Sequence, residues 1–339
     1  MNMSTNQANL CKNPVVVAVT LLLLTGLPSW SQAQLRIEVW PFESMTMTGD
    51  AFLRGEPGKP VMLAGELRIP RPGTDKLPAV ILAHASGGIN AGVDRWAQEL
   101  NSIGVAAFLL DSFSGRGMLS VPPDPSNESV MWYIVDAYRA LGMLAQHPRI
   151  DPQRIAIMGF STGGGAAIYS SIDRFWRSYG PPNVQFAAHI GFYGSCAVVY
   201  RDEEKVTGKP IRLFHGTADD LEVIEPCRAY VARLKKAGAD VALTEYPGVQ
   251  HGYDWFMFKE PLKLPQARTV RNCSLVEGER GQLVDTKTGK PYDPNVSCNE
   301  RGGTLLYNEA AAVATTASVK EFLTTTFGLK PRPTLPLNK

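Results

Sequence analysis

Residues 159–163 read Gly-Phe-Ser-Thr-Gly, and this short run constrains the possible folds more than any other part of the sequence. It follows residues 154–158 (Arg-Ile-Ala-Ile-Met), which are typical of a buried strand, and precedes a glycine- and alanine-rich stretch that is typical of a helix start. A serine in such a tight strand-to-helix turn has a strained backbone, and side chains at the flanking glycine positions would collide with the strand and the helix. Although such short glycine-rich runs also occur by chance, this context predicts that the Ser161 hydroxyl projects over the end of a sheet as a nucleophile.

Strand and helix patterns alternate along the chain, which predicts an α/β fold with a mostly parallel central sheet and helices on both faces. The continuous apolar run 79–84 is expected of a central strand that is covered on both sides. Residues 63–69 alternate moderately and stop at Pro70, which favours an early antiparallel strand. The other expected strands are 105–110, 154–158, 186–192, 211–214 and 241–246, and the expected helices are 93–103, 129–146, a helix with its buried face at 227–234, and 308–327.

Residues 258–306 interrupt this alternation and show no clear periodicity. A loop of this length inside a domain is normally functional, so we interpret the segment as an insertion before the last helix. Within it, residues 284–292 resemble a hairpin. Because the insertion follows a candidate catalytic histidine, we expect it to lie near the mouth of the active site.

The first 33 residues are predicted to be a secretory signal peptide, and residues 34–339 a single domain. Lys12 is the only charged residue of the leader, an apolar stretch begins at Val15, and Ser31-Gln32-Ala33 offers the small residues that precede a cleavage site. A retained membrane anchor is the alternative, although the apolar run is short for spanning a bilayer. The prediction is an exported protein, periplasmic or secreted, without stable membrane insertion after the leader is removed.

Four cysteines remain after removal of the leader, and an even number in an oxidising compartment suggests two disulfides. Three pairings are possible. We favour Cys273–Cys298, because both lie in the irregular segment, and Cys196–Cys227, because each follows a core strand. Structural zinc is disfavoured because the sequence has no Cys-x-x-Cys pair.

The formal net charge of +2 and the lack of a basic stripe with interleaved aromatic residues argue against nucleic acid as a partner. A small molecule is therefore the expected partner. The sequence leaves the oligomeric state open.

A serine hydroxyl needs a base within hydrogen-bonding distance, and the base needs an orienting acid. In a fold with this strand–serine–helix turn the order along the chain is serine, acid, histidine. His251 directly follows the last predicted strand and is the expected base, whereas His215 is expected to pack beneath the acid loop and His189 to be a core residue. Asp219 is preferred over Asp220 as the acid, with the other aspartate at a helix N-terminus.

Two N–H groups are needed for the oxyanion that forms on attack. We assign one to Thr162, which follows the nucleophile, and the other to Ser86 in the loop 84–88, with Ala85 as the alternative. His84 is interpreted as a structural hydrogen-bonding residue.

Three further side chains are candidates for binding substrate. Arg116 would hold a substrate carboxylate or, in the preferred structural alternative, pair with an acid such as Asp111. Tyr253 and Trp255 would line the pocket or pack beneath the insertion.

Taken together, these motifs resemble the dienelactone hydrolase family, and the resemblance covers about residues 63–327. It implies the α/β-hydrolase fold and an exported serine hydrolase that cleaves an ester or lactone through Ser161, His251 and Asp219. The enzyme that names the family has a cysteine nucleophile and lacks the 258–306 insertion, so dienelactone itself is not implied as the substrate. The motifs that carry the resemblance are 111–117 (DSFSGRG), 159–164 (GFSTGG), 191–194 (GFYG), 215–219 (HGTAD), 251–253 (HGY) and 307–311 (YNEAA).

The expected mechanism is acyl transfer through an acyl-enzyme, with no metal or organic cofactor. One alternative is a non-catalytic ligand-binding protein of the same fold, in which the insertion occludes the site. Another is a small peptidase related to the catalytic domain of prolyl oligopeptidase, although the chain is too short to add a propeller domain to this one.

Overall fold

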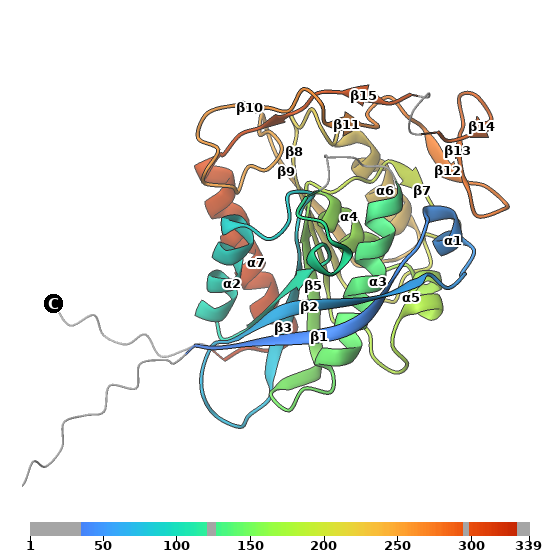
Figure 1. Cartoon of the computed structure of the whole chain (residues 1–339). Helices are drawn as coiled ribbons and strands as arrows, with labels where there is room; N and C mark the ends of the chain where they lie inside the picture. The colour runs from blue at the N-terminus through green and yellow to red at the C-terminus, as the bar shows by residue number, and fades with distance from the viewer. Residues whose placement is uncertain (1–34, 121–126, 294–297, 331–339) are drawn as a thin grey trace, which may run out of the picture. The chain divides into compact units, whose positions relative to one another are not determined.

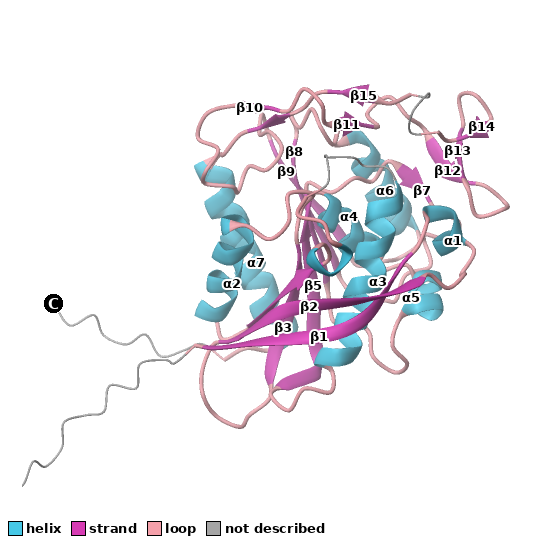
Figure 2. Ribbon diagram, in the orientation of Figure 1, coloured by secondary structure: helices cyan, strands magenta, loops and turns pink. Residues whose placement is uncertain are grey.

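The computed structural model describes residues 35–120, 127–293 and 298–330. Among these residues, an eight-stranded sheet has the strand order β1-β2-β4-β3-β5-β6-β8-β9 (Figures 1 and 2). The strands from β4 through β3 to β9 are parallel, whereas β2 is antiparallel to both β1 and β4. The strand bounds are β1 Arg36–Thr46, β2 Lys59–Ile69, β3 Leu77–Ala83, β4 Ala106–Asp111, β5 Ile150–Phe160, β6 His189–Phe192, β8 Ile211–Gly216 and β9 Val241–Tyr246.

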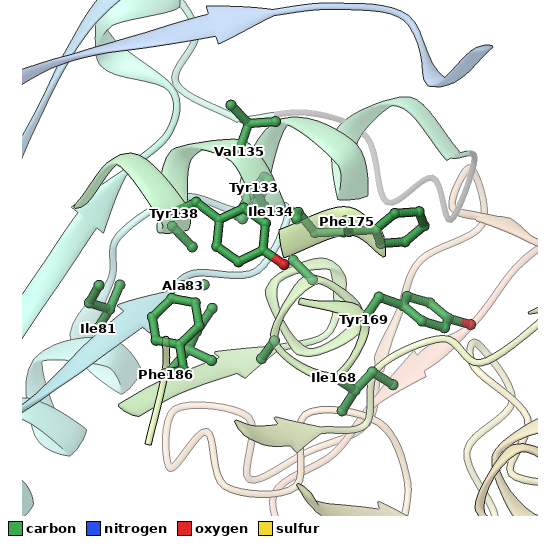
Figure 3. Close-up of a cluster of buried hydrophobic side chains, with 14 of the residues drawn as sticks. Ile81, Ala83, Tyr133, Ile134, Val135, Tyr138, Ile168, Tyr169, Phe175 and Phe186 are labelled. Atoms are coloured by element: carbon green, nitrogen blue, oxygen red, sulfur yellow. The ribbon is translucent and has the colours of Figure 1, made fainter. Parts of the chain in front are cut away.

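Helices cover both faces of the sheet, which confirms the predicted α/β-hydrolase fold. Helices α2 and α7 pack on one face, and α3, α4, α5 and α6 pack on the other. Figure 3 shows part of the core beneath α3, where the ring of Tyr138 stacks with that of Phe186, and Ile81 and Ala83 of β3 belong to the same cluster. The helix bounds are α1 Gly49–Leu53, α2 Ala91–Ser102, α3 Asn127–Leu144, α4 Thr162–Tyr169, α5 Asp173–Tyr179, α6 Glu225–Lys236 and α7 Glu309–Phe327, with a 3₁₀ turn η1 at Ser114–Arg116.

Strand β3 shows why its sequence is apolar without interruption. Val80 and Leu82 enter the core beneath α2 and α7, whereas Ile81 and Ala83 enter the core beneath α3. Because side chains alternate between the two faces of a strand, a strand that is covered on both faces needs apolar residues at every position.

Edge strand β1 was not predicted from the sequence. Its pairing with β2 extends from Arg36 to Thr46, but one side of the strand faces solvent and Val39 is 71% exposed. The exposed apolar residues and interspersed charges of this strand blur the alternation on which strand prediction relies.

The insertion is built from short strand pairs, which Figure 1 shows in orange. The predicted hairpin is present as β13 and β14, and together with β12 it extends strand β7 into a four-stranded sheet. The bounds are β7 Val198–Val199, β10 Leu262–Lys263, β11 Arg268–Thr269, β12 Leu275–Glu277, β13 Leu283–Asp285, β14 Lys290–Pro291, β15 Glu300–Arg301 and β16 Thr304–Leu305.

Both predicted disulfides are confirmed. Cys196 is bonded to Cys227 on α6, and Cys273 is bonded to Cys298 within the insertion. Disulfides are compatible with the predicted export, while the predicted leader lies outside the described residues. In the part of the chain that the structure describes, no helix has the length and apolar character needed to cross a membrane.

His189 on β6 is a core histidine, as expected. Its Nδ1 lies 3.1 Å from the carbonyl oxygen of Ala167 and 3.0 Å from Ser170 Oγ. Burial lowers the pKa of His189 to about 4. An unfolded histidine has a pKa of about 6.5, so between these values the unfolded chain binds a proton that the folded chain does not.

We therefore expect His189 to destabilise the fold progressively as pH falls from about 6.5 to about 4. His189→Asn keeps a donor to Ala167 but removes this titration. The free energy of unfolding of the wild type should fall by about 3 kcal/mol relative to that of the variant between pH 7 and 4. Urea denaturation at several pH values measures this difference, and parallel stability profiles would contradict the prediction.

Candidate active site

Ser161 occupies a strained turn between β5 and α4. Its φ of +52° is rare for a residue other than glycine. A Cβ at Gly159 would lie 1.9 Å from the carbonyl oxygen of Gly163, and a Cβ at Gly163 would lie 2.2 Å from that of Ala83. Both glycines are therefore required by the close approach of backbone segments, as the sequence pattern predicts.

The structure brings Ser161, His251 and Asp219 together from three loops that follow β5, β9 and β8. The Nε2 atom of His251 lies 3.0 Å from Ser161 Oγ, and its Nδ1 lies 2.7 Å from Asp219 Oδ2. All three side chains are almost completely buried. The imidazole thus joins the hydroxyl to the carboxylate in one hydrogen-bonded chain.

Asp219 is held as an anion by its neighbours. Burial opposes ionisation, but the charge of His251 and hydrogen bonds from His215 and His251 keep the pKa of Asp219 well below its ordinary value. Its other oxygen accepts the backbone N–H groups of Leu221 and Glu222. His215 lies beside this acid loop, where its Nε2 donates to the carbonyl oxygen of Glu222 at 2.6 Å.

Asp220 has a different role from the one expected for the second aspartate. Its carboxylate accepts from both the backbone N–H and the hydroxyl of Thr304, each at 2.7 Å. Instead of sitting at a helix N-terminus, Asp220 ties the acid loop to strand β16 of the insertion.

The pKa of His251 is set by opposing effects. Burial lowers it, but the negative charge of Asp219 and the hydrogen bond to its carboxylate outweigh burial and raise the pKa above 6.5. Glu222 and Asp220 raise it further by their charge. The same charge would stabilise an imidazolium formed during proton transfer.

Tyr193 supports the imidazole and was not singled out from the sequence. Its ring lies 4.7 Å from that of His251 in an edge-on arrangement. Its hydroxyl donates to the buried carboxylate of Asp254, which also accepts from the indole N–H of Trp96. The available signal was its position directly after a predicted strand, in the run 191–194.

His84 fixes the loop opposite the nucleophile. Its Nε2 accepts the backbone N–H of Ser112, so Nδ1 carries the proton and donates to the carbonyl oxygen of Ala85 at 2.7 Å. Burial lowers the pKa of His84 to about 4, and the ring therefore stays neutral near pH 7. A neutral ring that both accepts and donates matches the structural role expected for His84.

Arg116 does not face the site. Its guanidinium pairs with Asp136 at 2.8 Å and also donates to Thr46 Oγ1 and to the carbonyl oxygens of Ser112 and Met45. The preferred structural alternative is thus confirmed, but the acid is Asp136 and not Asp111, whose carboxylate accepts the backbone N–H groups of Phe113 and Ser114. With its donors used in this way, Arg116 has none directed to a substrate carboxylate.

The structure separates the two aromatic candidates. Tyr253 is fully buried beneath Tyr193 and its hydroxyl contacts Thr315, so the prediction that it lines the pocket is wrong. Trp255 lines a cavity of about 260 Å³ that also reaches Ser161 and His251. Residues lining this cavity include Ser86, Ser161, His251, Trp255, Leu264 and Leu305.

The insertion lies at the mouth of the site, as expected. Leu305 forms an isolated bridge with His251, and Leu264 and Leu305 both line the cavity. Because the cavity reaches Ser161, the insertion borders the site without filling it. The described residues contain no group of three or more His, Cys, Asp or Glu side chains placed to hold a metal ion.

Comparisons with known proteins identify the family of the chain. The model of the dienelactone hydrolase family matches residues 65–260, which is more than half of the chain. A probable 2-oxo-3-(5-oxofuran-2-ylidene)propanoate lactonase from Bradyrhizobium sp. is 26% identical over 60% of this chain and 84% of its own length. Thiohydrolase aneE from Aspergillus aculeatus is 33% identical, but the match covers only 27% of this chain and 28% of the thiohydrolase.

Solved structures share the fold at low sequence identity. A dienelactone hydrolase-like promiscuous phosphotriesterase from metagenomic libraries has a TM-score of 0.54 and 15% identity, covering 86% of this chain and 98% of its own. A butyrate-bound esterase from Thermogutta terrifontis has a TM-score of 0.50 and 16% identity, covering 80% and 91%.

We expect the imidazole of His251 to titrate above pH 6.5 in the wild type and below it in Asp219→Asn. Without the Asp219 charge, burial becomes the larger effect and lowers the pKa. NMR titration of the histidine Cε1–H signals measures both values, with assignment from a His251→Gln variant. Asp220→Asn is the matched control and should lower the pKa by less, whereas equal shifts in the two variants would contradict this account.

Proposed function

The chain belongs to the dienelactone hydrolase family and is a carboxylic ester hydrolase, and we propose that Ser161, His251 and Asp219 together cleave an ester or lactone bond. One observation carries the proposal: a single imidazole lies 3.0 Å from the serine hydroxyl and 2.7 Å from a buried carboxylate. These distances suit a nucleophile, its general base and the acid that orients the base.

In the proposed reaction, His251 removes the proton of Ser161 as the oxygen attacks the carbonyl carbon. The imidazolium, stabilised by Asp219, then protonates the leaving alkoxide, and an acyl-enzyme remains on Ser161. Water attacks this acyl-enzyme with His251 again acting as base, which releases the acid and restores the serine. With a lactone, the alcohol and the acid belong to the same product molecule.

The oxyanion formed on attack is assigned to the N–H groups of Thr162 and Ser86. Thr162 is the first residue of α4, where backbone N–H groups lack partners within the helix. The carbonyl oxygen of Ala85 accepts from His84 and from the backbone N–H of Gly88. Because a trans peptide directs its carbonyl and its N–H oppositely, this fixes the direction of the Ser86 N–H, and Ser86 lines the cavity with Ser161.

Export of the protein remains part of the proposal. The predicted leader and the two disulfides support an oxidising compartment, for which the bacterial periplasm is our preferred choice. The disulfide within the insertion would hold that segment in place at the mouth of the cavity.

Ser161→Ala is expected to lower kcat for 4-nitrophenyl esters by about 10³-fold or more, because the variant lacks the nucleophile. A fluorophosphonate probe should label the wild type at Ser161. In a separate experiment with an ester substrate, mass spectrometry should show an acyl adduct on the wild type. Ser178→Ala, at an exposed position on α5, is the matched control and should keep both properties. Labelling that persists in Ser161→Ala would assign the nucleophile elsewhere.

His84 is proposed as a positioning residue for the oxyanion site, which a pair of variants tests. His84→Leu removes the shortest of the hydrogen bonds to the carbonyl oxygen of Ala85 and should lower kcat by about 10²-fold with little change in KM, as expected for one misplaced oxyanion donor. His84→Asn places an amide N–H near the original Nδ1 and should recover most of that loss. Equal kcat values in two folded variants would show that the donor to Ala85 is not needed.

A further inference from the structure

The cavity that reaches Ser161 is walled by apolar groups. Ala85, Leu221, Trp255, Leu264 and Leu305 contribute carbon surface to it. Among the residues that the structure describes, none of those lining this cavity is a lysine or an arginine. A substrate group that enters the cavity therefore meets hydrocarbon on most sides and has no cation to pair with.

The insertion supplies part of this wall through Leu264 and Leu305. Leu305 of β16 pairs with Leu262 of β10 and bridges to His251 by its backbone. Leu264 follows β10 directly, and its backbone N–H donates to the carbonyl oxygen of Gly303. Both cavity leucines are thus fixed by backbone hydrogen bonds within the insertion.

The charges closest to the base are negative. Asp219 contacts His251 directly, and Glu222 and Asp220 act on it through their charge. Asp219 and Glu222 are buried, so solvent screens them weakly. These carboxylates favour the imidazolium form of His251, and they repel an anionic substrate group that comes close to this imidazole.

The nearby cations are held in other interactions. Arg271 and Lys263 line a neighbouring hollow of about 320 Å³ that shares Leu264 with the catalytic cavity. Arg271 pairs with Glu300 and donates to the carbonyl oxygen of Asp220, and Lys263 donates to Thr304. Arg116, the third candidate, is paired with Asp136 away from the cavity.

From this geometry we infer that the site selects small, uncharged esters and discriminates against esters whose acyl chain carries a carboxylate. The inference rests on the proposed function and adds the substrate class. A carboxylate placed in this cavity would lose its hydration without gaining a cationic partner, which is far more costly than burying a methyl group. The volume of about 260 Å³ is slightly below the range of typical ligand pockets and favours small substrates.

Three 4-nitrophenyl esters of matched length test the inference: the hexanoate, the adipate monoester and the neutral monoamide of adipate. At pH 8 the wild type should cleave the hexanoate with a kcat/KM about 100-fold or more above that of the adipate, after subtraction of spontaneous hydrolysis. The amide should fall between them, because it is polar but uncharged. An adipate value equal to or above the hexanoate value would overturn the inference.

Leu264→Arg then places a cation at the wall of the cavity. Leu264 is partly exposed, so the longer side chain has room to reach solvent. The kcat/KM for the hexanoate divided by that for the adipate should fall by about tenfold in this variant. In the matched Leu264→Gln it should fall by no more than about threefold. Similar ratios in both variants would overturn the inference.

Thermal unfolding establishes that each variant is folded. If Leu264→Arg is not folded, Leu305→Arg provides the same test, because Leu305 is also partly exposed. Fluorophosphonate labelling of Ser161 distinguishes the two levels of the argument. An unlabelled wild type that cleaves none of the three esters would refute the proposed function. A labelled wild type that prefers the adipate would refute only the inference about substrate charge.

Discussion

The close approach of three backbone segments at Ser161 is the constraint on which the site depends. Gly159 and Gly163 allow strand β5, helix α4 and the end of β3 to come closer than any side chain would permit. That contact holds Ser161 at a positive φ and places its hydroxyl at the start of α4. Energy that packing provides elsewhere in the sheet is thus used to keep Ser161 in an otherwise unfavourable conformation.

Much of this arrangement can be predicted from the sequence because the signals are local. The turn that holds Ser161 can be predicted from the spacing of two glycines between a strand and a helix. His251 and Asp219 can be predicted because they follow later strands in the expected order. Local signals fail where a partner is distant in the chain. The sequence did not identify Asp136 as the acid that pairs with Arg116, because Asp136 lies on a helix twenty residues further on. It also left the position of Tyr253 open, because the partner of its hydroxyl, Thr315, lies on α7.

Electrostatics divides the site into two parts with different tasks. Around His251, Asp219 and its neighbours keep negative charge close to the imidazole. This charge favours the protonated imidazole that the proposed mechanism requires. On the loop side, His84 is kept neutral by burial and can donate and accept at once. Two histidines of the same intrinsic basicity therefore differ in protonation, because Nδ1 of His251 bonds to a carboxylate and Nδ1 of His84 bonds to a backbone carbonyl oxygen.

The insertion joins substrate selection to this chemistry. Leu305 lines the cavity and also bridges to the backbone of His251, while its neighbour Thr304 donates to Asp220 beside the acid. The segment that shapes the cavity is therefore also the segment that braces the base and the acid loop. An exchange of side chains that line the cavity can alter selectivity alone, whereas a shift of β16 would move the cavity wall and the imidazole of His251 together.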